Sequence, residues 1–108
     1  MIKLAFADGV IEKITCSHED LFVDFLDWQE KLWVITFKNV SGFKGIGAVG
    51  SEVSEFTEEE DGAFLQEIVS LDPLEGGRNY CFTSARGGNI ILIVVAKCYE
   101  VEVVGVKG

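Results

Sequence analysis

The stretch RNYCFTSARGGNIILIVVAK, residues 78–97, decides the fold class of this 108-residue chain. A Gly-Gly pair stands at residues 87–88, and this pair is among the strongest short signals for a β-hairpin. The segments on either side, Arg78–Ala85 and Asn89–Lys97, are therefore expected to pair as antiparallel strands.

The apolar pattern continues past this hairpin to the end of the chain. An unbroken strand from Asn89 to Val106 would be far longer than the usual length of about five or six residues. We therefore expect a bend or bulge near Lys97-Cys98. Beyond the bend, alternation predicts that Tyr99, Val101 and Val103 face the core and that Glu100 and Glu102 face solvent.

Two more hairpins are expected, over residues 2–17 and 20–40. In the first, Ile2, Leu4 and Phe6 alternate with smaller or charged residues, as in a half-buried strand. Asp8-Gly9 would supply the positive φ angles of a tight turn before the return strand.

The second hairpin is expected to join Asp20–Trp28 to Lys31–Val40 through Gln29-Glu30. Its first arm contains LFVDFL, residues 21–26, which is apolar on both faces and is typical of a central strand. On the second arm, alternation predicts that Trp33, Ile35 and Phe37 point to one side.

One helix is expected between the second and third hairpins. Thr57-Glu58-Glu59-Glu60 matches a capping box, apolar residues follow at helical spacing over 64–69, and Pro73 ends the run. A strand over 66–71 is the alternative. We therefore expect an α+β fold in a single domain, 1–108: mainly an antiparallel sheet of about six to seven strands, in hairpins 2–17, 20–40 and 78–106, with one short helix near 58–70.

The charge of the chain is concentrated in one segment. The formal net charge is −9, and no Lys or Arg lies between Lys44 and Arg78. Such a segment repels phosphates and anionic lipids, which argues against nucleic-acid or membrane partners, and it attracts basic proteins. A solvated face that only aids solubility is the alternative. The candidate partner-binding residues are Glu52, Glu55, Glu58, Glu59, Glu60, Asp61 and Glu67.

No motif for catalysis, a cofactor or a metal passes inspection. GIGAVG, residues 45–50, lacks the strand–loop–helix context of a dinucleotide site. EEEDG, residues 58–62, lacks the distal bidentate ligand of a calcium loop. His18 is the only histidine, and a reactive thiol at Cys16 would need a positive neighbourhood, whereas the residues after His18 are the acids Glu19 and Asp20. We expect no enzyme, no cofactor and no metal.

The start of the chain, the length of its apolar runs and its cysteines lead us to expect a cytoplasmic protein. No signal peptide is recognisable at the start, and the longest apolar run, Ile90–Ala96, is too short to span a membrane. Cys16, Cys81 and Cys98 lie in apolar, strand-like segments, where we expect buried, free and inert thiols.

Four short stretches resemble the small acidic immunity-type proteins of bacterial polymorphic toxin systems. They are His18-Glu19-Asp20, Asp27-Trp28, Phe37-Lys38-Asn39-Val40 and Ile93-Val94-Val95-Ala96-Lys97. The chain departs from that pattern at Asp20, where a small apolar residue is expected, and in the glycine loop 42–50. The resemblance implies a toxin inhibitor that acts by binding, and it assigns no contact residue.

We therefore interpret the chain as a non-enzymatic cytoplasmic binding protein, with an immunity protein that inhibits a basic toxin by occlusion as the leading hypothesis. Two alternatives stay open. One is a structural or homo-oligomeric β domain with no toxin partner, with a homodimer formed through a strand edge. The other is a module that binds a small ligand.

Overall fold

A computed structural model describes residues 4–73 and 76–106 of the chain. Within this part of the chain, strands and one helix follow one another along the sequence. They are β1 (Gly9–Ser17), β2 (Asp20–Leu26), β3 (Lys31–Lys38), β4 (Gly42–Gly45), β5 (Glu52–Glu59), α1 (Ala63–Leu71), β6 (Arg78–Ser84), β7 (Ile90–Ala96) and β8 (Cys98–Val106).

All the strands belong to one antiparallel sheet in the order β4-β7-β6-β5-β1-β2-β3-β8. The α+β class is confirmed, but the described residues form eight strands, not six to seven. The difference arises in the middle of the sequence. The glycine-rich segment supplies β4, which pairs with β7, and the acidic segment supplies β5, which pairs with β6.

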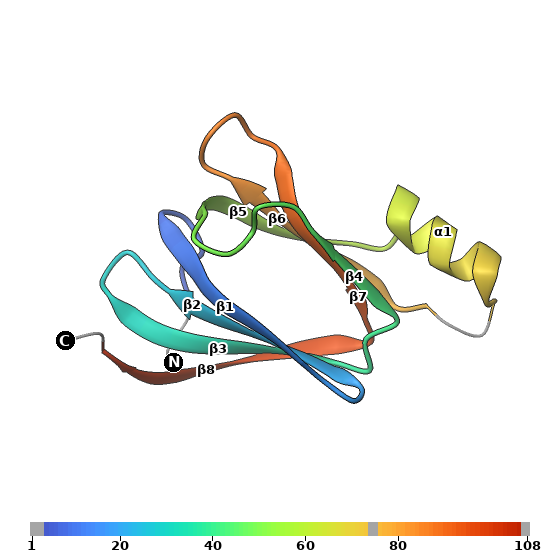
Figure 1. Ribbon diagram of the computed structural model, residues 1–108, viewed down its shortest axis with the longest axis horizontal. Helices are drawn as coiled ribbons and strands as arrows, with labels where there is room; N and C mark the ends of the chain where they lie inside the picture. Colours follow the sequence, from blue (N-terminus) through green and yellow to red (C-terminus); the bar gives the residue numbers. More distant parts are fainter. Residues whose placement is uncertain (1–3, 74–75, 107–108) are drawn as a thin grey trace.

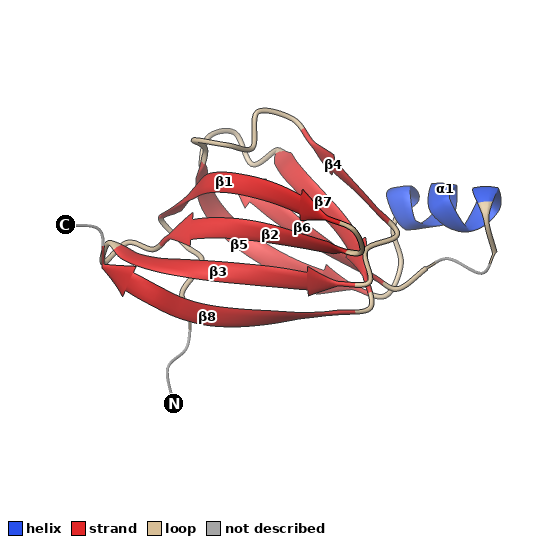
Figure 2. Cartoon of the chain, turned by 60° about the horizontal axis from the view of Figure 1, so that its bottom comes forward, coloured by secondary structure: helices blue, strands red, loops and turns tan. Residues whose placement is uncertain are grey.

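The sheet folds over into two layers, with β1, β2, β3 and β8 in one and β4, β5, β6 and β7 in the other (Figures 1 and 2). The chain passes from one layer to the other at Lys97, directly between β7 and β8. There the Lys97 N–H donates a 3.0 Å hydrogen bond to the carbonyl of Lys38. The expected bend near Lys97-Cys98 is confirmed.

Aromatic side chains fill the space between the layers. Phe37 of β3 lies 5.4 Å from Tyr80 and 6.3 Å from Phe82, both on β6, measured between ring centroids. Phe56 of β5 joins the same cluster, with its ring 4.8 Å from that of Phe82. Because aromatic pairs at these distances add to the free energy of burial, the cluster ties the two layers together.

The second hairpin is confirmed, and the third is confirmed over β6 and β7. The rest of the predicted range 78–106 is wrong as part of that hairpin, because β8 pairs with β3. β2 pairs with β3 from Leu21↔Phe37 to Leu26↔Leu32, and β6 pairs with β7. β2 lies between β1 and β3, as its apolar sequence predicts. Trp33, Ile35 and Phe37 are all buried on the inner side.

The prediction of the first hairpin is wrong for its first strand. Residues 4–6 form no strand, Ile2 lies outside the described residues, and β1 pairs with β2 and β5. The turn at Asp8 does exist, with φ of 66°. Leu4 is buried, and Phe6 stacks on Phe56 at 4.4 Å. The apolar alternation thus reflects insertion into the core without strand pairing.

The helix is confirmed and the alternative strand over 66–71 is wrong, but the capping box is also wrong. Thr57 lies within β5, opposite Cys81 of β6, and α1 begins after Gly62. Backbone pairing with β6 and burial of Phe56 outweigh the cap, which is worth only about 0.5–2 kcal/mol. Asp61 takes over part of that role, because its carboxylate accepts a 2.8 Å hydrogen bond from the Gly62 N–H.

Two expectations about buried residues are wrong, one for the valines of the edge strand β8 and one for two of the cysteines. Val101 and Val103 remain 37% and 36% exposed, since the aromatic contacts reach β8 only at Tyr99. Cys98 at the start of β8 and Cys16 near the end of β1 are exposed, and only Cys81 is buried. No helix in the described part of the chain has the length and apolar character needed to cross a membrane.

Candidate binding surface

A β-bulge in β5 sets which way its acids point. Val53 pairs with Ser84 and Glu55 with Thr83, so Ser54 is the extra residue. Three residues apart on a regular strand, Val53 and Phe56 would face opposite sides. The bulge lets both point inward, with Val53 fully buried and Phe56 in the aromatic cluster, while Glu55 is exposed.

All the predicted partner-binding residues are exposed, but they do not form one cluster. They follow the chain from β5 through a turn into the helix, which projects at one end of the molecule (Figure 1). We call this the acidic surface. Its members are Glu52, Glu55, Glu58 and Glu59 on β5, Glu60 and Asp61 in the turn, and Glu67 on α1.

Arg78 at the start of β6 is the cation that contacts this surface among the described residues. Its Nε pairs with Oε1 of Glu58, and its Nη1 lies 3.9 Å from Oε1 of Glu60. No local sequence signal predicts this pairing, because the β5–β6 ladder brings together residues twenty positions apart. Glu58 is therefore partly neutralised. The pairs are well exposed, so each contributes about 0–1 kcal/mol to stability.

Asp61 serves the start of the helix. Its Oδ1 accepts hydrogen bonds from Gln66 Nε2, at 2.5 Å, and from the Gly62 N–H. The Gln66 and Gly62 bonds lower the pKa of Asp61. Within the described residues, the other four acids of the acidic surface form no ion pair with a Lys or Arg. They are Glu52, Glu55, Glu59 and Glu67.

One thiol and two acids outside the acidic surface are buried or half-buried. Burial and the nearby Glu59 carboxylate raise the pKa of the Cys81 thiol, which keeps it protonated at neutral pH. Asp27 is buried but bonded within its own turn, and Asp24 is half-buried on the outer side of β2. No group of three or more His, Cys, Asp or Glu side chains among them could hold a metal ion.

Two hollows mark the surface. One of about 350 Å³ is lined by Val10, Gly50, Ser51, Glu52, Ser84 and Arg86. Another of about 190 Å³ includes Cys16 and His18 among its lining residues. Small-molecule sites are mostly apolar clefts of about 300–1,000 Å³. Val10 is the one apolar side chain among the lining residues of the first hollow, and the second hollow is smaller than that range.

Comparisons of this chain with protein-family models, curated proteins and solved structures give no match.

Proposed function

We propose that this protein is a non-enzymatic binding protein that engages a basic protein partner through its acidic surface. The observation that carries the proposal is the exposure of every predicted acid from Glu52 to Glu67, with Arg78 as the cation in contact. Nine acids fall between Lys44 and Arg78, equal to the whole net charge of −9. Such a field accelerates the approach of a cationic partner and repels an anionic one.

The backbone of β5 gives part of the surface a fixed geometry. Glu55 and Glu59 lie on a strand paired to β6, four residues apart. At about 3.3 Å per residue, their backbones are about 13 Å apart. Each carboxylate would therefore meet a separate basic side chain, and the backbone that carries it is already ordered before binding.

Occlusion is the mechanism that follows from this chemistry. A toxin that acts on phosphate-bearing substrates holds them in a cationic cleft, and a rigid row of carboxylates competes for the same cleft. The resemblance to immunity-type proteins supports this role, and a cytoplasmic location would fit it. We therefore propose an immunity protein that inhibits a basic toxin, such as a nuclease.

The neighbouring gene provides the experiment. The proposal expects it to encode a large secreted protein with a basic C-terminal domain. That domain, expressed alone, should bind this chain and lose its toxicity on co-expression. A neighbouring basic domain that neither binds nor is neutralised would overturn the immunity role. Binding that survives a fourfold Gln substitution at Glu52, Glu55, Glu59 and Glu67 would overturn the role of the acidic surface.

A further inference from the structure

The two end strands of the sheet differ in how well they are protected from an added strand. Within the described residues, β4 and β8 each pair with a neighbour on one side alone, and β8 forms the free margin of its layer (Figure 2). β4 has four residues, and it carries two glycines and Lys44. β8 has nine residues and contains no Lys, Arg or Pro. Proteins commonly protect an edge by keeping its strand short or by placing Lys or Pro on it, so β8 is the less protected edge.

The regular part of β8 has one apolar side and one acidic side. Its ladder with β3 runs without a shift over residues 98–103 and then meets a bulge at Val104. Successive side chains of this stretch point to opposite faces. The inner face carries Tyr99, Val101 and Val103, and the outer face carries Glu100 and Glu102.

The two valines lack the cover that their ladder partners have. Val101 is 37% exposed, whereas Ile35 opposite it on β3 is fully buried. Val103 is 36% exposed, whereas Trp33 opposite it is 3% exposed. A further strand beside β8 would cover both valines and would pair the free N–H and C=O groups of the edge.

The two acids on the outer side have no cation across the ladder. Glu100 is exposed and lies opposite Thr36. Glu102 is exposed and lies opposite Val34. Neither acid forms an ion pair in the described part of the chain. Both carboxylates are therefore open to a cation that comes from outside.

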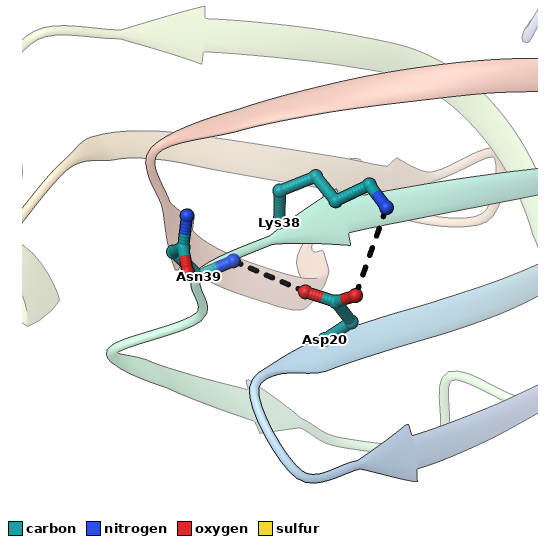
Figure 3. A network of polar contacts seen from close by, with 3 residues as sticks. All are labelled: Asp20, Lys38 and Asn39. Atoms are coloured by element: carbon teal, nitrogen blue, oxygen red, sulfur yellow. Dashed lines mark hydrogen bonds and ion pairs between the residues drawn. The ribbon is translucent and has the colours of Figure 1, made fainter.

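The lysine of β3 at this end of the ladder is already engaged. Lys38 lies opposite Cys98, the first residue of β8. Its Nζ lies 3.7 Å from Oδ2 of Asp20 on β2, and Asp20 also accepts a hydrogen bond from the Asn39 N–H (Figure 3). Because β3 separates β2 from β8, this contact directs the ammonium group away from the free edge.

A second copy of this chain is a poor match for the edge. In an antiparallel pair, side chains that stand opposite each other lie on the same face. A β8–β8 register centred on Glu100 or on Glu102 places that acid against itself, and one centred on Val101 places Glu100 against Glu102. Like charges directly opposite each other destabilise a ladder, whereas opposite charges stabilise it. The acids therefore favour an incoming strand with Lys or Arg at alternate positions.

We propose that β8 accepts an extended segment of the basic partner as an added strand of the sheet. Basic side chains of the segment would face Glu100 and Glu102, and the apolar side chains between them would cover Val101 and Val103. Backbone hydrogen bonds would supply affinity, and the alternating side chains would supply specificity. The inference rests on the proposed function, because it assigns a binding mode to the same basic partner.

The edge begins close to the strand that carries most of the acidic surface. The ring centroid of Tyr99 on β8 lies 5.3 Å from that of Phe56 on β5. Glu55 and Glu58 flank Phe56 at short sequence distance on the same strand. A partner held by the acidic surface would therefore bring its basic segments near to β8.

A synthetic peptide tests the edge without the partner. The probe is about seven residues long, a common strand length, alternates lysine with valine and carries a fluorescent label. One comparison peptide has glutamate in place of lysine. Another keeps the lysine and valine side chains but has a methyl group on each backbone nitrogen. Fluorescence anisotropy over about 1–100 μM protein would measure binding, and amide hydrogen exchange followed by NMR would locate it.

The wild-type chain should bind the lysine peptide at least about tenfold more tightly than either comparison peptide. Amide exchange should slow over residues 98–103 and stay unchanged in β4, the other end strand. Absence of binding, equal binding of the methylated peptide, or no added protection in β8 would overturn the proposal.

Charge exchange on the protein gives a second test. Glu100→Lys combined with Glu102→Lys should reverse the preference, so that the glutamate peptide binds more tightly than the lysine peptide. The matched control, Glu19→Lys combined with Glu30→Lys, makes the same change in charge in two connections between strands and should keep the wild-type preference. Circular dichroism would check that both variants fold. A preference that the two variants change alike would contradict the proposal. Both variants retain the acidic surface, so failure here is distinguishable from failure of the proposed function.

Discussion

The indole Nε1–H of Trp33 donates a 2.9 Å hydrogen bond to Oδ2 of Asp27 across the β2–β3 turn. The other carboxylate oxygen accepts 2.9 Å bonds from the backbone N–H groups of Gln29 and Lys31. Asp27 is 6% exposed, so this buried acid is fully engaged in holding the turn. Its neighbour Trp28 is 60% exposed and takes no part in that network.

Because of Asp27, the free energy of unfolding should vary with pH in the acidic range. Burial raises its pKa, but the bonds from Trp33, Lys31 and Gln29 outweigh burial and hold the pKa below its ordinary value of 3.8. A lowered native pKa contributes stability above the unfolded value, and this is lost as pH falls through the native pKa. Asp27→Asn should cost about 1–2 kcal/mol at pH 7.

Urea unfolding at neutral pH and below about pH 4 would measure this difference. The difference in the free energy of unfolding between wild type and Asp27→Asn should decrease as the solution becomes more acidic. A gap that stays constant with pH would show that the charge of Asp27 is not what the network stabilises. Trp33→Phe, which removes one donor and keeps an aromatic ring, should cost less than Asp27→Ala.

Gly9 should tolerate no side chain. A Cβ at this position would collide with the ring of Phe25 and would lie 2.9 Å from the Leu26 carbonyl oxygen. Gly9→Ala should therefore lower the free energy of unfolding by about 2 kcal/mol or more, as overpacking does. Gly105→Ala is the matched control, because its Cβ would meet open space. Equal melting temperatures for the two variants would contradict the close approach at Gly9.

Gly88 tests the backbone of the β6–β7 turn alone. Its φ is 70° and a Cβ there would meet nothing within 4 Å. Gly88→Val should cost about 1 kcal/mol or more, because β-branched residues are rare at positive φ. Gly88→Asn should cost less, since Asn adopts this conformation more readily. Thermal unfolding of both variants would check the order, and Val as stable as Asn would refute it.

The thiols should divide two to one in reactivity. Cys16 and Cys98 are exposed, and Cys81 is buried with a raised pKa. Because the thiolate is the reactive form, iodoacetamide at neutral pH should label two thiols of the folded chain readily and the third only on unfolding. Intact mass spectrometry would count the adducts. Rapid labelling of Cys81 would contradict its burial.

Local chemistry explains which strands the sequence predicts. The Gly87-Gly88 turn carries its own backbone preference, with φ of 80° and 70°, so the third hairpin can be found without its surroundings. Trp33 and Phe37 alternate in a pattern that only a strand with one buried face produces. These signals need no knowledge of distant partners.

The missed strands depend on such partners. The glycine-rich β4 exists because β7 supplies its ladder, from Gly42↔Val95 to Gly45↔Leu92. The sequence around Thr57 predicts a helix cap, because its pairing with Cys81 on β6 cannot be seen from neighbouring residues. The cysteines on β1 and β8 resemble core residues in the sequence because alternation does not reveal where a strand lacks a neighbour. Cys16 lies beyond Gly9 and Val10, the residues of β1 that pair with β5. Cys98 is the clearest case, since it begins the edge strand.

The acidic surface was predictable in composition and not in detail. Exposure of Glu55 and Glu59 follows from the cost of burying a charge. The bulge at Ser54, which turns Glu55 outward, follows from the opposing demands of Val53 and Phe56 for the core. The pairing of Arg78 with Glu58 depends on strand register, which residues so far apart in sequence do not disclose.

The central claim is tested most directly by an association rate. The partner would be the basic C-terminal domain that we propose the neighbouring gene encodes. Stopped flow would compare wild type with a surface variant, Gln at Glu52, Glu55, Glu59 and Glu67. The control, which we call the frame variant, makes the same change in charge at four acids outside the acidic surface: Asp8→Asn, Glu12→Gln, Glu19→Gln and Glu30→Gln. The Debye length falls from about 30 Å at 0.01 M salt to about 8 Å at 0.15 M.

We predict that the surface variant associates about tenfold or more slowly than wild type at 0.01 M salt, and that the frame variant changes the rate much less. The difference should narrow at 0.15 M as screening sets in. Equal rates for the two variants, or a wild-type rate that ignores salt, would contradict the claim that the acidic surface binds a basic partner.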